Sequence, residues 1–222
     1  MKRIACLAAV AAMFSTPALA TDSGHNWSGF YVGAHAGYDW FETETNDYYG
    51  YDHDLDGFSG GIQVGYDHQH PNGIVTGFIA DIGLSEASGS RNIVDTGGIT
   101  VVTQTRSKTE AYSTFRGRLG YAAGAFLPYL TGGIAWARQE VDYFQDFGFG
   151  FTTNVNETKN RVGWTAGAGL EYALSDRMSV KAEYLYMDLG SENYAGTWFG
   201  LPVDGDIDLT SDRVSLGVNF RF

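Results

Sequence analysis

The stretch "RVSLGVNFRF" at residues 213–222 decides the fold class. Polar or small residues alternate in it with apolar ones, which are Val214, Leu216, Val218, Phe220 and Phe222. Successive side chains of a β-strand point to opposite faces. The pattern therefore predicts a strand with one apolar and one polar face.

The same alternation recurs in seven segments upstream. They are "FYVGAHAGYDW" (30–40), "FSGGIQVGYDH" (58–68), "IVTGFIADIGL" (74–84), "AYSTFRGRLGY" (111–121), "LPYLTGGIAWA" (127–137), "RVGWTAGAGLEY" (161–172) and "MSVKAEYLYMDL" (178–189). Segments of about 10 residues have the length of tilted strands that cross a bilayer.

The connections between these segments alternate in length. Short ones are expected at 69–73, 122–125 and 174–177, and long ones at roughly 42–57, 86–108, 140–160 and 189–210. Outer-membrane barrels have short periplasmic turns and long external loops in this order. The sequence predicts an all-β fold, an eight-stranded antiparallel transmembrane β-barrel.

The two faces of the strands indicate which side is inside. A soluble barrel, such as a lipocalin-like carrier, is the alternative, with its apolar face inward. The interior of an eight-stranded barrel has little room, and the polar face here is rich in glycine, for example Gly65, Gly83 and Gly167. Bulky rings such as Trp40 and Trp164 lie on the apolar face, which we expect to face lipid.

The N-terminal stretch reads as a secretory signal peptide. Residues 1–20 combine basic Lys2 and Arg3, an apolar run and a closing Ala-Leu-Ala, the pattern of such a leader. We expect cleavage after Ala20 and a barrel domain over 21–222. Cys6 is the one cysteine of the chain and lies in this leader, so we expect neither a disulfide nor a cysteine-bound metal in the mature protein.

The charge of the chain argues against one class of partner. Its 26 acidic and 14 basic residues give a formal charge of −12. Binding of nucleic acid needs clustered Lys and Arg, so we expect no nucleic-acid partner.

Three stretches carry a resemblance to a known family. "WSGFYVGAHAGYDW" (27–40), "RVGWTAGAGLEYAL" (161–174) and "VKAEYLYMDLG" (180–190) resemble strands of small porin-family, OmpA-like outer-membrane proteins of Gram-negative bacteria, which include surface antigens and hemin-binding proteins. The terminal "VNFRF" resembles the signal, with Phe220 and Phe222, that the outer-membrane assembly machinery reads. The resemblance implies the outer membrane as location, with lipid, lipopolysaccharide and that machinery as partners.

Charged residues of the polar face are candidates for a network in the lumen. They are Asp39, Asp67, Asp81, Glu110, Arg116, Arg118, Glu171, Lys181, Glu183, Arg213 and Arg221. Because unpaired buried charges are costly, we expect these groups to pair. The network either plugs the lumen permanently or acts as a gate that opens when pairs exchange.

Histidines and tyrosines raise the question of a ligand. Tyr and His can ligate haem iron, so the cluster of Tyr48, Tyr49, Tyr51 and His53 in the first long connection is a candidate hemin contact. His35 is expected to join the lumen network near Asp39. His68 and His70 share a strand face, but no further ligands are evident for a metal, and we expect no metal and no cofactor.

The sequence favours a structural role over chemistry. No nucleophile has a His and a carboxylate at a spacing that indicates a hydrolase, so we expect the protein not to be an enzyme. The favoured function is a structural, surface-exposed role in the cell envelope with a largely plugged lumen. The alternatives are a small-solute porin and a hemin-binding surface receptor or adhesin that contacts the host.

Overall fold

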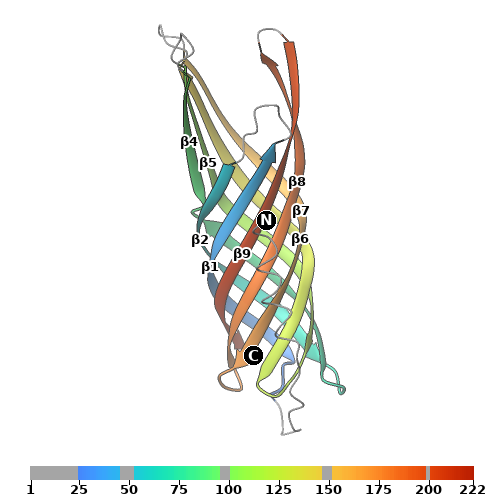
Figure 1. Cartoon of the computed structure of the whole chain (residues 1–222). Helices are drawn as coiled ribbons and strands as arrows, with labels where there is room; N and C mark the ends of the chain where they lie inside the picture. Colours follow the sequence, from blue (N-terminus) through green and yellow to red (C-terminus); the bar gives the residue numbers. More distant parts are fainter. Residues whose placement is uncertain (1–24, 46–52, 96–100, 147–151, 199–200) are drawn as a thin grey trace.

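The computed structural model describes residues 25–45, 53–95, 101–146, 152–198 and 201–222, with side chains for 25–41, 56–87, 111–138, 160–190 and 209–222 (Figure 1). The strands are β1 (Gly29–Thr45), β2 (His53–Gln69), β3 (Ile74–Ser85), β4 (Ser88–Asp95), β5 (Val101–Tyr121), β6 (Phe126–Asp146), β7 (Thr152–Ala173), β8 (Met178–Trp198) and β9 (Leu201–Arg221). Among the described residues no helix is long and apolar enough to cross a membrane. The expected signal peptide, residues 1–20, lies outside the described residues.

The sheet closes on itself. β1 pairs antiparallel with β2 on one side and with β9 on the other. β3 and β4 both pair antiparallel with β5, along its residues 111–121 and 101–108, so together they form one barrel strand. The fold is thus an eight-stranded closed antiparallel barrel, which confirms the sequence expectation.

The interruption between β3 and β4 has a local cause. The strand is broken at Glu86 and Ala87, and the Glu86 amide donates to the Phe58 carbonyl at 2.8 Å. The backbone of Ala87 lies against Gly57, where an added Cβ would stand 2.6 Å from the Ala87 Cα. Only a glycine at this position admits the close approach.

The short turns are confirmed at the end of the barrel where β9 ends (Figure 1). They join β2 to β3, β5 to β6 and β7 to β8. Gly73 and Gly124 adopt φ angles of +84° and +64° in two of them, a conformation in which glycine lacks the strain of other residues.

The expectation of long loops at the other end is wrong in large part. β6 runs to Asp146 and β7 starts at Thr152, and these ends are paired residue by residue. β5 likewise begins as early as Val101, and its first residues pair with β4 and β6. Ladder hydrogen bonds use the backbone alone, so mostly polar segments can extend the strands beyond the membrane-crossing part.

The extended strands divide into two walls above the barrel. β7 pairs with β8 only from Trp164 to Ala173, and β2 pairs with β3 only from Ser59 to Gln69. Beyond these points one wall contains β4, β5, β6 and β7, and the other contains β8, β9, β1 and β2, with a single bridge from Asp56 to Ser88 among the described residues. Figure 1 shows the β8–β9 hairpin diverging from the first wall.

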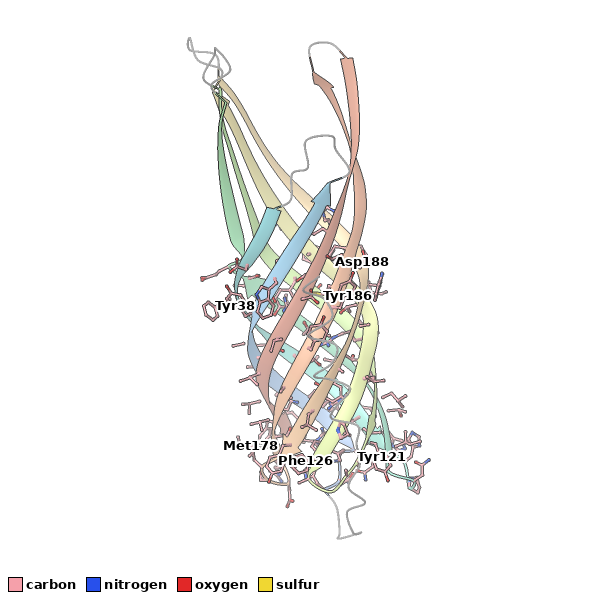
Figure 2. The ribbon with its side chains drawn as sticks, in the orientation of Figure 1. Tyr38, Tyr121, Phe126, Met178, Tyr186 and Asp188 are labelled. Carbon is pink, nitrogen blue, oxygen red and sulfur yellow. The ribbon has the colours of Figure 1, made fainter. Side chains whose placement is uncertain are left out.

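The outer surface of the closed barrel is apolar. Exposed large side chains on every strand of the closed ring form a band, among them Phe30, Ile62, Ile82, Phe115, Ile134, Val162, Met178 and Leu216. Figure 2 shows Tyr38, Tyr186 and Asp188 at one limit of this part of the barrel, and Tyr121, Phe126 and Met178 at the other. An apolar band with aromatic rims faces the lipid in membrane barrels, so the predicted orientation is confirmed.

Candidate functional site: the barrel interior

The structure places ten of the predicted charged residues inside the barrel. Five are acids and five are bases, and each is at most 5% exposed. They are Asp39, Asp67, Asp81, Arg116, Arg118, Glu171, Lys181, Glu183, Arg213 and Arg221. Glu110, the eleventh, lies at a bulge of β5, and its side chain is outside those described.

The group nearest the short turns has two acids and two arginines. Arg118 Nη1 lies 3.1 Å from Asp67 Oδ2, and Arg118 Nη2 donates to Glu171. Arg221 Nη2 lies 3.1 Å from the same Asp67 oxygen. Asn219 completes the group with a hydrogen bond of 2.9 Å to Glu171. The four charges balance.

A second group lies midway along the barrel. Arg116 Nη2 is 2.8 Å from Asp81 Oδ2, and its Nη1 is 3.1 Å from Glu183 Oε1. Lys181 Nζ lies 3.2 Å from the same Glu183 oxygen, and the Tyr129 hydroxyl donates to Glu183 Oε2 at 2.8 Å. This group is also neutral, with two acids and two bases.

The third group is one pair between the first and the last strand. Arg213 donates to Asp39, its register partner on β1. The Ser85 hydroxyl donates to Asp39 Oδ2 at 3.0 Å. Each of the three groups is neutral by itself, which limits the cost of burying ten charges because every one has an opposite charge in contact.

Three inward tyrosines support the arginines. Each ring lies across a glycine on the neighbouring strand, within 2.4 Å of where a Cβ would stand, and near a guanidinium. The sets, each with the distance from the guanidinium carbon to the ring centroid, are Tyr31 with Gly65 and Arg221 (5.1 Å), Tyr112 with Gly83 and Arg213 (3.6 Å), and Tyr129 with Gly169 and Arg118 (3.9 Å). A cation over an aromatic face is attracted by the ring quadrupole. The interior glycines thus make room for rings as well as for a narrow lumen.

Two apolar clusters enclose the charged groups, and the sequence analysis did not anticipate them. The outer cluster lies toward the two walls and consists of Phe41, Ala87, Ala135, Ala137, Met187, Leu189 and Leu209, all buried. The inner cluster, at the end with the short turns, consists of Trp27, Val75 and Leu127, with Ala122 and Ala173 packed against it. Ions and water cross packed apolar side chains poorly.

The three histidines on the strand faces and at the first short turn have other contacts. His35 bonds to the Tyr112 hydroxyl through Nε2 at 2.8 Å instead of to Asp39. The rings of His68 and His70 meet edge to face at 4.8 Å. The described residues contain no group of three or more His, Cys, Asp or Glu that could hold a metal ion.

Two further sets of predicted residues differ in what the structure describes. Tyr48, Tyr49 and Tyr51 lie outside the described residues, and so does the side chain of His53, so hemin contact stays a prediction. Phe220 and Phe222 are described and exposed on the lipid-facing side of β9, with ring centroids 5.3 Å apart. Their role as an assembly signal also stays a prediction.

Outside the membrane band, the His25 side chain has a shifted pKa. The His25 ring meets Trp27 edge to face at 4.5 Å. Burial, and next the positive charge of Arg221, lower the pKa of the His25 imidazole below its usual value. The ring beside the inner cluster is therefore favoured in its neutral form.

The chain is similar to known proteins over most of its length. A profile described as the outer membrane protein beta-barrel domain matches residues 6–222. The 31 kDa outer-membrane immunogenic protein of Brucella melitensis biotype 1 is 32% identical over 250 residues, covering 97% of this chain and 98% of the relative. The 25 kDa outer-membrane immunogenic protein of Brucella abortus biovar 1 is 33% identical over 198 residues, covering 88% and 80%.

Among solved structures, Neisserial surface protein A has a TM-score of 0.47 and 18% identity, and the similarity covers 88% of this chain and 98% of the other. The family profile and the two Brucella relatives agree on the type of protein and on its location in the outer membrane, where lipid and lipopolysaccharide surround it. The chain belongs to the outer membrane protein beta-barrel family.

Proposed function

We propose that the protein is a sealed barrel with a structural, surface-exposed role in the cell envelope. It anchors the two extracellular β-walls and does not conduct solutes. One observation carries the proposal: the described interior runs from the apolar cluster of Trp27 through ion-paired charges to the apolar cluster of Phe41.

The closed interior favours this role over a small-solute pore. A conducting lumen needs a continuous polar path, as in the wide porins. Here the charged side chains contact one another, and buried side chains lie above and below them. Exchange of ion pairs alone would leave both apolar clusters in place, so it would not open a path.

Conductance decides between the two functions. The refolded protein in a planar bilayer is expected to give no steady channels. A variant with Trp27→Ala, Phe41→Ala and Leu189→Ala loosens both apolar clusters and is expected to give openings, which shows that the assay can detect a path. Steady conductance of the unchanged protein would overturn the proposal and favour the pore.

In cells, deletion of the protein should raise the sensitivity of the envelope to detergent. Restoration of resistance by the non-conducting protein supports the structural role.

A further inference from the structure

Residues 25–28 lie under the barrel mouth at the end with the short turns. Trp27 is fully buried there among Val75 and Leu127. Its backbone amide donates to the side-chain oxygen of Gln69, Oε1, at 2.9 Å, and the backbone amide of Gln69 donates to the Ser28 hydroxyl at 3.0 Å. The segment is therefore fixed to the end of β2 and covers the mouth.

Arg221 on β9 holds this segment from the opposite side. Its Nη1 donates to the Trp27 carbonyl and lies 3.4 Å from the Gly29 carbonyl oxygen. Its Nη2 donates to Asp67 on β2 at 3.1 Å. The guanidinium carbon is 5.6 Å from the centroid of the Trp27 ring. One side chain thus contacts the covering segment, β1 and β2.

These contacts cross the seam that closes the barrel. β9 and β1 are the strands whose pairing completes the ring, with Arg221 opposite Tyr31. On its own side of the seam the Arg221 guanidinium lies 3.9 Å from Glu171. The Trp27 and Gly29 carbonyls and Asp67 all arrive with β1 and β2. Closure of the seam therefore gives Arg221 most of its hydrogen-bond partners at once. Hydrogen bonds from a charged guanidinium are stronger than neutral ones.

We propose that Arg221 is a closure lock, which fastens β1 to β9 and in the same step holds residues 25–28 under the mouth. Closure of the seam and covering of the mouth are then one event. Arg213 and Asp39 pair across the same seam, but they lie farther along it, where Asp39 also accepts a hydrogen bond from Ser85. The lock is therefore specific to the end with the short turns.

Cysteine pairs measure seam closure directly. Val32 and Phe220 are register partners across the β1–β9 seam, and Phe115 and Ile134 are register partners across β5–β6. Both spacings suit a disulfide between adjacent antiparallel strands. Each pair is changed to cysteine in a chain of residues 21–222, which contains no other cysteine. A third reporter, Val75→Cys, measures covering of the mouth by its reaction with a polar thiol reagent, because Val75 is fully buried in the inner cluster with Trp27.

Each reporter is placed in three refolded proteins: the otherwise unchanged chain, the Arg221→Gln variant and the Arg177→Gln variant. Arg177 is an exposed arginine of the β7–β8 turn and serves as the control. Arg221→Gln is expected to lower disulfide formation at the β1–β9 pair severalfold and to leave the β5–β6 pair unchanged. It should also raise labelling of the Val75→Cys reporter severalfold. Arg177→Gln should change none of the three.

Equal loss of disulfide formation at both cysteine pairs would mean that Arg221→Gln destabilises the whole barrel, and this would overturn the lock. Unchanged disulfide formation at both pairs would overturn it too. If Arg221→Gln does not refold, Arg221→Lys has the same readouts. It keeps the charge but lacks the planar fork that reaches carbonyl and carboxylate together, so the same selective loss at the seam is expected.

Discussion

The interior of this barrel changes its chemistry along the axis. Between the inner cluster at the short turns and the outer cluster it holds ten charged residues in neutral groups. Toward the walls most inward positions are apolar, with Phe41, Met187, Leu189 and Leu209 buried in one cluster. Arg161 and Ser211, register partners of two members of this cluster, are buried there as well. The two regions belong to the same strands and differ in what surrounds them.

The outer surface changes in the opposite sense. Around the charged interior it carries exposed Phe, Ile, Leu and Val side chains. Around the apolar interior many outward positions are polar or charged, including Asp56, Glu86, Arg138, Asn160, Asp188 and Asp212, although Trp40 and Val162 are also exposed there. Where lipid lies outside, the inside can be polar, and where water lies outside, burial of apolar side chains has to occur inside. The level at which both faces switch marks the outer limit of the lipid.

The largest expected effect breaks the charged region. Arg118→Leu removes the contacts of one guanidinium with Asp67 and Glu171. Because it leaves buried carboxylates short of a partner, we expect the free energy of unfolding to fall by about 4 kcal/mol. Urea titration of the protein refolded in vesicles measures it. Arg177→Leu, at an exposed turn position, is the control and should cost less than about 0.5 kcal/mol; similar losses in the two variants would mean that the ion pairs do not hold this region.

The sequence alone was sufficient to predict the eight membrane-crossing segments and which of their faces turns to the lipid, because both follow from alternation within one segment. The switch of faces is also present in the sequence of β9, where Val203, Ile207 and Leu209 are apolar at odd positions and Val214 and Leu216 at even ones. Reading this change of phase would have predicted the apolar outer interior and would have extended the strand to the start of β9.

The remaining features depend on which strands meet. Arg118 contacts Asp67 on β2 and Glu171 on β7, and such choices follow from the stagger of the closed sheet. The position of Trp27 under the mouth depends on Gln69 and Arg221, which are far away in the sequence. Alternation within one segment holds no information about either.

A second prediction sharpens the limit of the lipid. Leu216 is an exposed outward residue within the apolar band, and Thr210 is an outward residue of the same strand beyond the switch. Leu216→Lys places a charge in lipid and should lower the free energy of unfolding in vesicles by about 3 kcal/mol. Thr210→Lys should cost no more than about 1 kcal/mol, because the outer limit of the lipid is near. Equal costs would mean that the switch of faces does not mark the limit.

The smallest effect tests whether the outer apolar region is a packed core. Leu189→Ala removes a buried side chain of the outer cluster. We expect a loss of about 2 kcal/mol, at the low end for a buried leucine because the two walls separate next to this position and the site can collapse. The same urea titration measures it.

Leu174→Ala provides the matched control, since Leu174 is 56% exposed beyond the end of β7 and the same methyl groups are removed. Leu174→Ala should lower the free energy of unfolding by no more than about 0.5 kcal/mol. If Leu189→Ala cost as little as this control, the cluster would contribute no packing energy, and the apolar inward positions would have to be explained without the exchange of lipid for water outside. If the costs differ as expected, one rule accounts for both regions, since each buries its apolar side chains on the face that water does not reach.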